Sequence, residues 1–375
     1  TPEALAEQLR AAGALASPIE GAPSALRLDG LGDPSRSPSF LAGDWTVQDA
    51  GAQQVGHLAA PRAGMRILDA CAGVGGKSTH LAELTDDAAA IDAADQSRTK
   101  LGLLEETARR LGLGGIRTHA CDLLDPAASQ ALPDAPNVLF LAGRKFGTLD
   151  RTDITWTTNT IVPARVAERF SQSRVIVFST GNVYPLVAVS GRAPTEDDVP
   201  APVGEYAQSC LGRERVMEFV SREKGMPALI YRLNYAVDLR YGTLVDIARR
   251  VFDGEPIDLS MGFFNAIWQG DANSYALRCL ELCSSPPAIL NVTGPERIGV
   301  REIAEWFGSA FGRTARFVNT EGPVALLSDS SRCRALLGEP EVPLTVLRQW
   351  VAHWVLSGGA SLNKPTHFEV TDGRF

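Results

Sequence analysis

The stretch Met65-Arg-Ile-Leu-Asp-Ala-Cys-Ala-Gly-Val-Gly-Gly-Lys-Ser-Thr-His80 decides the fold of the first part of this 375-residue chain. It predicts a strand over 65–70, a glycine-rich turn, and a helix over 78–84. Glycines let the backbone approach a ligand closely, and the free N–H groups and dipole of a helix N-terminus favour negative charge. The spacing matches neither a P-loop nor the Gly-x-Gly-x-x-Gly dinucleotide fingerprint. We therefore expect an anion-binding turn that belongs to neither class.

The residues after this turn alternate between strands and helices, which is typical of a mostly parallel sheet covered by helices. The pattern predicts strands at 88–92 and 116–121 around a helix at 97–111. After a polar, proline-containing link the alternation resumes, with elements expected at 137–142, 156–170, 174–179, 206–224 and 228–232. The chain is therefore predicted to be an α/β protein with a Rossmann-like, doubly wound, mostly parallel sheet.

Three domains follow from this pattern. Residues 1–60 form a short N-terminal appendage, 61–235 a Rossmann-like cofactor domain, and 236–375 a smaller C-terminal α/β lobe that binds substrate. Within the middle domain, the strands of 61–125 and of 137–235 are expected to close as one continuous sheet, with the junction inside 122–137.

Composition excludes several classes of protein. The net charge of −8 and the pI near 5.3 argue against a large nucleic-acid surface, so RNA is not expected as a partner. There is no run of about 20 apolar residues and no signal-peptide pattern at the start, so we expect a cytoplasmic protein without membrane contact. The six cysteines and five histidines lack metal-type spacing, which predicts reduced thiols and no metal site.

Two acidic residues are expected at strand ends, where ligands bind in open α/β sheets. Asp92, at the predicted end of the second strand, has the side chain to accept hydrogen bonds from ribose hydroxyls, and Asp122 follows the third strand, where it would meet an adenine edge. The alternative interpretation is that the glycines only shape a tight turn and that these acids cap helices.

With these motifs and with Gly43-Asp-Trp-Thr-Val-Gln-Asp49 and Arg110-Leu-Gly112, residues 38 to about 125 resemble the RNA cytosine-5 methyltransferases that modify ribosomal RNA. The resemblance implies S-adenosylmethionine as the cofactor. The cofactor contacts that it implies are Ala72, Gly73, Gly75, Gly76, Lys77, Asp92, Arg98 and Asp122.

The chain lacks the nucleophile of that family. The family places a cysteine in a Pro-Cys motif after the fourth strand and a second cysteine in a Thr-Cys motif. Here the fourth strand leads into Leu141-Ala-Gly-Arg-Lys145 and the fifth into Ser179-Thr-Gly181, without a cysteine in either place. Because attack on a pyrimidine ring requires a thiolate, we expect no methyl transfer to cytosine.

Residues 137–375 resemble extended short-chain dehydrogenase/reductases, the NAD-dependent epimerase and dehydratase group. The residues that carry the resemblance are Val138-Leu-Phe-Leu-Ala-Gly143, Phe178-Ser-Thr-Gly-Asn-Val-Tyr184, Tyr206, Arg232-Leu-Asn234 and Leu290-Asn-Val-Thr-Gly-Pro295. The resemblance implies that Thr180 orients a substrate hydroxyl and that Tyr206 acts as acid and base. It also implies NAD as the cofactor, a nucleotide sugar as the substrate, and a homodimer.

This half also departs from its family. The lysine expected one helical turn after Tyr206 is Cys210, and a neutral thiol does not lower a phenol pKa as an ammonium does. Lys145, after the fourth strand, is a candidate to supply the missing charge. The Gly-x-x-Gly-x-x-Gly turn of the family is absent. In the alternative interpretation, Thr180 and Tyr206 are a strand-end hydroxyl and a helix-start aromatic residue without a catalytic role.

The sequence therefore predicts a chimeric Rossmann-fold protein that binds S-adenosylmethionine or S-adenosylhomocysteine with little or no native catalysis. One alternative is an NAD-dependent epimerase or dehydratase that acts on a nucleotide sugar. The other is an RNA cytosine-5 methyltransferase, which would need a cysteine that neither expected position holds.

Overall fold

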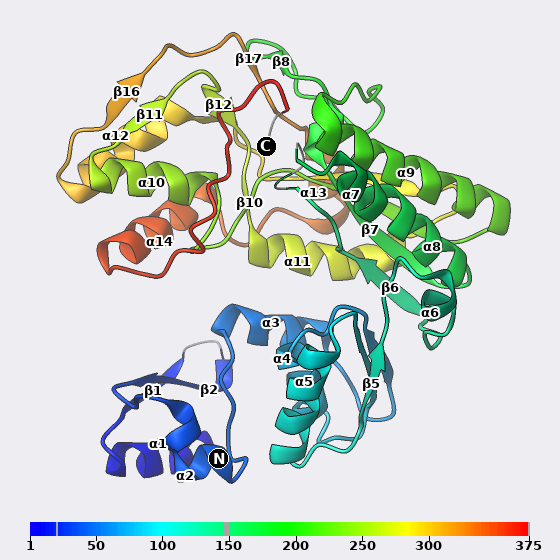
Figure 1. Cartoon of the computed structure of the whole chain (residues 1–375). Coiled ribbons are helices and arrows are strands. Elements are labelled where there is room, and N and C mark those ends of the chain that lie inside the picture. Colours follow the sequence, from blue (N-terminus) through cyan, green and yellow to red (C-terminus); the bar gives the residue numbers. More distant parts are fainter. Residues whose placement is uncertain (20–21, 146, 148–149, 374–375) are drawn as a thin grey trace. The chain divides into compact units, whose positions relative to one another are not determined.

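The computed structural model describes residues 1–19, 22–145, 147 and 150–373 (Figure 1). The chain divides into two compact units, residues 1–135 (unit 1) and 136–375 (unit 2). Both contain parallel strands joined by helices, so the predicted α/β class with mostly parallel sheets is confirmed. Within the described residues, no helix combines the length and the apolar character needed to cross a bilayer.

Unit 1 begins with helix α1 (Pro2–Ala11), which packs on the antiparallel hairpin of β1 (Leu15–Ile19) and β2 (Ala22–Asp29). Short helical segments η1 (Pro34–Arg36) and α2 (Pro38–Leu41) lead into α3 (Ala50–Ala59).

The parallel sheet of unit 1 has three strands in the order β3-β4-β5. Their bounds are Arg66–Asp69, Ala90–Asp95 and Ile116–Ala120. Helices α4 (Gly76–Glu83) and α5 (Arg98–Arg110) make the two crossovers, and the short helix α6 (Pro126–Gln130) follows β5. The central strand is buried because an alanine-rich run lets both helices approach it closely.

The sheet of unit 2 has four parallel strands in the order β14-β9-β7-β6. The strands are β6 (Asn137–Phe140), β7 (Arg174–Thr180), β9 (Ala228–Leu233) and β14 (Ala288–Val292). The helical segments between β6 and β9 are α7 (Thr152–Trp156), the π-helical η2 (Thr157–Ile161), α8 (Val162–Arg169) and α9 (Gly204–Lys224).

Helices cover both faces of this sheet, as the doubly wound arrangement requires. Ile176, Leu229 and Tyr231 pack against α11 (Gln269–Arg278) and α13 (Ser331–Leu337). The residues between them along the strands point to the opposite face, where α8 and α9 lie side by side (Figure 1).

The last part of unit 2 has its own apolar core. Helices α10 (Thr243–Asp253), α12 (Val300–Phe311) and α14 (Leu344–Leu356) pack around it. The short strand pairs of this region are β11 (Pro256–Asp258) with β16 (Arg316–Val318), β10 (Ala236–Val237) with β13 (Ile267–Trp268), β12 (Phe263–Phe264) with β15 (Ile298–Gly299), and β8 (Val187–Ala188) with β17 (Val324–Ala325).

Each unit, described by itself, has its own parallel sheet. The expectation that the strands of 61–125 and of 137–235 close as one continuous sheet stays a prediction. The boundary between the units falls after residue 135, inside the predicted junction of 122–137. The finer division at residues 60 and 235 stays a prediction.

A buried ion pair ties α9 to the sheet of unit 2. Arg232 on β9 donates from Nε and Nη2 to the carboxylate of Glu214, over 3.0 and 2.7 Å. Both side chains are at most 2% exposed. Ser179 donates to the same carboxylate over 2.5 Å, and Arg232 donates to the Tyr184 hydroxyl over 2.6 Å. These hydrogen bonds link β9 and the end of β7 to α9, and β9 to the loop that follows β7.

Removing one partner of this pair should destabilise the chain. Arg232→Met leaves the Glu214 carboxylate buried without its cation, which costs about 3–5 kcal/mol. Urea unfolding of the full chain measures the loss. The double variant Glu214→Leu/Arg232→Met removes both charges and should recover part of it. A loss below about 1 kcal/mol in the single variant would contradict this account, because such a value is typical of an exposed pair.

Candidate functional sites

The glycine-rich turn of unit 1 closes onto the acid at the end of β4. Gly73 and Gly75 adopt φ values of +57° and +89°, in the left-handed region that side chains disfavour. The N–H of Gly73 donates to Oδ2 of Asp95 over 3.0 Å, and the N–H of Ser97 donates to Oδ1 over 2.9 Å. Asp95 therefore joins the turn after β3 to the start of α5.

Space is open beside part of this turn. A Cβ at Gly75 would come within 2.3 Å of the Leu104 side chain, so this glycine allows the turn to pack on α5. At Gly73 and Gly76 a Cβ would meet nothing within 4 Å. These two glycines leave the backbone accessible next to the half-buried Asp95, which is the arrangement expected of a cradle for a ligand.

Side-chain hydrogen bonds hold the N-terminus of α4 at the cradle. The Ser78 hydroxyl donates to Asp69 over 2.8 Å, and Gln48 Nε2 donates to the carbonyl of Gly76 over 2.9 Å. These contacts fix the orientation of the first helical turn, whose free N–H groups face away from the helix body. The predicted site residues Ala72, half-buried, and Lys77, exposed, lie in this region.

The predicted placement of Asp92 at a strand end is wrong. Asp92 lies inside β4 and is 2% exposed. Its carboxylate accepts hydrogen bonds from Arg117 over 3.2 Å and lies 2.8 Å from Nε2 of His119, both on the neighbouring strand β5. Asp95 takes the strand-end position, and the sequence analysis missed it. The signal was available: Ser97, which caps α5, leaves room for the strand to continue to residue 95.

Arg98 and Asp122 lie where ligands bind in parallel sheets, and their roles stay predictions. Arg98 is the first residue of α5, shortly after the end of β4, and its side chain is exposed. Asp122 follows β5, is exposed, and accepts a hydrogen bond from the N–H of Leu124 over 2.9 Å. Both therefore flank the carboxyl end of the sheet in unit 1.

Unit 2 contains a cavity of about 200 Å³ that brings the predicted catalytic residues together. Thr180 ends β7, Tyr206 lies in the first turn of α9, and Lys145 follows β6; all three line the cavity. The other lining residues are Ser179, Asn182, Leu233, Asn234, Tyr235, Ala236, Tyr241, Gly242, Thr243 and Thr366. Burial lowers the pKa of the Lys145 ammonium, while the charge of Asp246 acts in the opposite direction.

The surroundings of Tyr206 keep its phenol protonated. Burial raises the pKa of Tyr206 well above its ordinary value, and Cys210 raises it further. The charge of Arg213 and a hydrogen bond with Thr180 oppose this rise without cancelling it. Burial also raises the pKa of the Cys210 thiol, so this residue is neutral near pH 7. Tyr206 is thus a hydrogen-bond donor rather than a ready base.

Tyr206 should remain protonated through the range in which ordinary tyrosines ionise. We expect the tyrosinate absorbance of the native chain and of Tyr206→Phe to coincide up to about pH 10. Because the folded-state pKa is raised, the stabilisation from the protonated phenol is fully present below the unfolded pKa and is lost as pH rises through the folded value. A Tyr206 transition near neutral pH would refute this assignment. Cys210→Lys should lower the pH at which Tyr206 ionises, because a neighbouring ammonium favours the charged phenolate.

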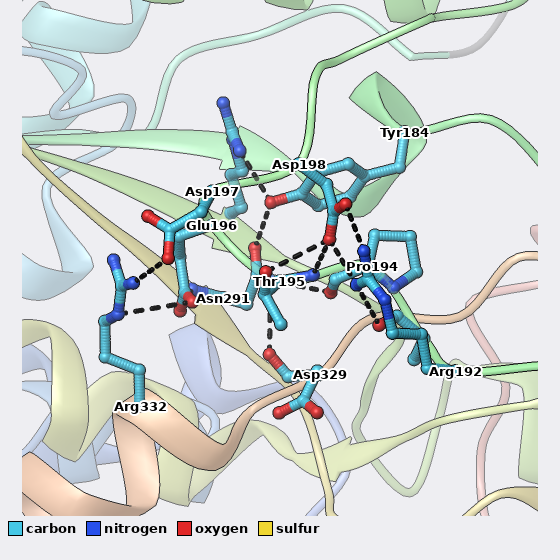
Figure 2. Close-up of polar contacts among 12 residues, drawn as sticks. Tyr184, Arg192, Pro194, Thr195, Glu196, Asp197, Asp198, Asn291, Asp329 and Arg332 are labelled. Carbon is cyan, nitrogen blue, oxygen red and sulfur yellow. Dashed lines mark hydrogen bonds and ion pairs between the residues drawn. The ribbon is translucent and has the colours of Figure 1, made fainter.

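A second buried network fixes the loop after β7 and lies apart from the cavity lining. Figure 2 shows Tyr184 turned toward Asn291, whose Oδ1 accepts its hydroxyl over 2.8 Å. The N–H of Asn291 donates to Glu196 over 2.8 Å, and its Nδ2 donates to the carbonyls of Pro194 and Asp329, each over 3.1 Å. The Tyr184 hydroxyl is therefore bound within this network and does not line the cavity. Tyr206, on α9, does line it.

Comparison with known proteins confirms the resemblance of the front part. The family described as 16S rRNA methyltransferase RsmB/F matches residues 57–136. A probable ribosomal RNA small subunit methyltransferase B from Synechocystis sp. is 35% identical over 187 residues, which cover 44% of this chain and 41% of that protein. A ribosomal RNA small subunit methyltransferase B from Xylella fastidiosa is 38% identical over 122 residues, or 32% and 28% of the two chains.

The chain thus spans about two fifths of the length of the first of these relatives. Their names point to ribosomal RNA as the substrate of the relatives, which opposes the prediction, made from net charge, that RNA is not a partner.

Solved structures confirm the resemblance of the larger part at the level of the fold. UDP-glucuronic acid 4-epimerase from Bacillus cereus, in complex with NAD, matches with a TM-score of 0.58 and 20% identity, covering 78% of this chain and 99% of that chain. The dTDP-glucose 4,6-dehydratase of Bacillus anthracis, in complex with NAD, matches with a TM-score of 0.60 and 15% identity, covering 78% and 97%. The chain therefore combines sequence similarity to a methyltransferase family with a fold similar to that of these solved structures.

Proposed function

We propose that unit 1 binds S-adenosylmethionine or S-adenosylhomocysteine and that the chain transfers no methyl group to cytosine. The observation that carries the proposal is the cradle formed by Gly73, Gly76 and Asp95, within the residues that match the methyltransferase family. Open space at Gly73 and Gly76 beside an acid at a strand end suits an adenosyl ligand with a charged amino-acid tail.

The chain offers a partner for each part of such a ligand. The backbone around Gly73 and Gly76, at the N-terminus of α4, suits a carboxylate. Asp95 would accept hydrogen bonds from the ribose hydroxyls, in place of the Asp92 that the sequence favoured, and Asp122 would meet the adenine edge. Lys77 and Arg98 border the site. When bound, S-adenosylmethionine supplies a methyl group on a positively charged sulfur.

The absence of methyl transfer is supported by the state of the thiols. The nucleophile must be a thiolate, yet the pKa is raised at every cysteine of the chain. The six residues concerned are Cys71, Cys121, Cys210, Cys279, Cys283 and Cys333. Burial is the largest cause in each case, and it raises the pKa of Cys279 and Cys333 to about 12. None of these thiols is activated for attack on a pyrimidine.

Asp95→Ala should weaken binding of S-adenosylhomocysteine at least about tenfold, or ~1.4 kcal/mol, because the ribose loses its acceptor. Isothermal titration calorimetry measures this. Asp95→Asn keeps a side-chain acceptor for the turn and should show an intermediate loss with an unchanged melting temperature. Glu106→Gln, on the exposed face of α5, is the matched control. Failure of the native chain to bind either adenosyl ligand at millimolar concentration would end the proposal.

Labelled methyl groups should not pass from S-adenosylmethionine to ribosomal RNA in the presence of this chain. The expectation follows from the missing cysteines and the protonated thiols. Ribosomal RNA that lacks the modification is the substrate, and a known cytosine-5 methyltransferase is the positive control. Incorporation above background would overturn this part of the proposal while leaving adenosyl binding intact.

A second candidate function is supported by the cavity of unit 2. Thr180, Tyr206 and Lys145 line it together, so an ammonium reaches the pocket although Cys210 occupies the usual lysine position. This arrangement favours an NAD-dependent epimerase or dehydratase that acts on a nucleotide sugar. The raised pKa of Tyr206 weighs against this second function.

Reduction of NAD in the presence of UDP-glucose, lost in the Tyr206→Phe variant, would support the second function. The homodimer and the cytoplasmic location remain parts of the proposal.

A further inference from the structure

We propose that residues 357–373, the segment after α14 (the strap), close the cavity of unit 2 and that lifting of the strap controls entry into it. The inference concerns access to the cavity and not the chemistry within it. It rests on the second candidate function only for the identity of the ligand that enters, and it holds whether or not hydride transfer occurs there.

The strap forms part of the cavity wall. Thr366 lines the cavity although it lies far in sequence from the other lining residues. Its N–H and its Oγ1 both donate to Oδ2 of Asp246 on α10, over 2.8 and 2.6 Å, and Thr366 is 3% exposed. In Figure 1 the strap is the red ribbon that leaves α14 and passes α10. One carboxylate thus holds this part of the wall in place.

Further contacts anchor the strap on both sides of that threonine. Before it, the N–H of Leu362 donates to the carbonyl of Arg240 over 3.1 Å. After it, Phe368 is 1% exposed and packs into the apolar core that α10, α12 and α14 share. Arg250 on α10 then donates to Glu369 over 3.3 Å. The strap is therefore fastened at separate points along α10 and its neighbours.

The last described residue of the strap lies against the start of α9. A Cβ on Gly373 would come within 2.4 Å of the carbonyl oxygen of Val203. A Cβ on Gly204 would come equally close to the carbonyl oxygen of Gly373. The two backbones therefore touch directly, two residues before Tyr206. The strap thus runs from α10 to α9, the two helices that supply Thr243 and Tyr206 to the cavity lining.

The strap is held less firmly than the elements beneath it. Residues 357–373 contain no helix or strand, so no regular backbone ladder secures them, and residues 362–365 are exposed. Asn363 and His367 have φ values of +51° and +52°, in the left-handed region that residues other than glycine disfavour. Thr366 lies between them. A segment with few backbone hydrogen bonds and a strained backbone is expected to open before the core does.

The cavity itself calls for a route of entry. Two polar atoms of its lining, Nδ2 of Asn234 and Oγ1 of Thr243, have no hydrogen-bond partner within the part of the chain that the structure describes. Their side chains are 2% and 1% exposed. Buried polar groups in folded proteins are nearly always satisfied, so these atoms indicate that the cavity takes up a polar molecule. Movement of Thr366 away from Asp246 would open the wall to such a molecule.

The test places a reporter cysteine in the cavity lining. Ala236→Cys is labelled with a methanethiosulfonate reagent, and labelling is followed by peptide mass spectrometry. Adding Thr366→Val removes the Oγ1 hydrogen bond at nearly constant size and should speed labelling at least about tenfold, or ~1.4 kcal/mol. Thr371→Val, the same change at an exposed residue of the strap, is the matched control and should leave the rate unchanged. Equal rates with and without Thr366→Val, or an equal gain with Thr371→Val, would overturn the proposal.

Hydrogen exchange separates lifting of the strap from unfolding of the chain. The amides of Leu362 and Thr366 should exchange faster in Thr366→Val, while those of β9 stay protected on the time scale of labelling. Labelling no faster than exchange in β9 would mean that the cavity opens only by unfolding and would contradict the strap. Neither measurement needs turnover. Failure to reduce NAD would therefore end the second candidate function without deciding the role of the strap.

Discussion

The buried pair of Glu214 and Arg232 is the interaction on which the geometry of unit 2 depends. It fastens α9 to β9, and through Ser179 it also reaches the end of β7. Thr180 is the next residue along that strand, and Tyr206 lies two turns before Glu214 on the helix. Two residues far apart in sequence therefore reach one cavity because a carboxylate and a guanidinium are satisfied between them. A buried charge pair contributes little net stability, but it enforces one arrangement of its surroundings.

Unit 1 achieves a comparable effect with backbone geometry. Asp95 accepts the N–H of Gly73, so the turn is shaped before any ligand arrives. Gly75 lets the turn lie against Leu104, where a side chain would clash. A preformed cradle spares a ligand the cost of ordering the loop. The two units thus use different means to hold polar groups in place, a hydrogen-bonded turn in one and a buried ion pair in the other.

Much of the architecture was predictable because periodicity and turn residues report local structure. The strands and helices from residue 65 onward lie close to their predicted positions, and the turn at Gly73 was identified from its spacing. Contacts between strands are a different matter. Asp92 is an acid within an alanine run, so local sequence favours the end of a strand there. In the structure, hydrogen bonds with Arg117 and His119 on β5 allow Asp92 to lie buried within β4. A single sequence does not reveal such partners.

The cavity of unit 2 shows the same limit. Thr180 and Tyr206 follow from a motif, whereas Lys145 reaches the lining from a loop with no regular pattern. Asn234 was recognised only as part of a motif, and Thr243 opens a helix in a manner typical of many structural residues. Their importance lies in what they lack, hydrogen-bond partners, and this becomes visible only when the surrounding chain is in place.

The protonated state of the cysteines has a consequence for the chemical durability of the chain. Peroxides oxidise thiolates far faster than thiols, and four of the six cysteines are also buried. Stepwise oxidation to sulfenic and sulfinic acids should therefore be slow at these positions. The buried cysteines of the folded chain should therefore stay reduced under mild oxidation, and unfolding should expose them to oxidants.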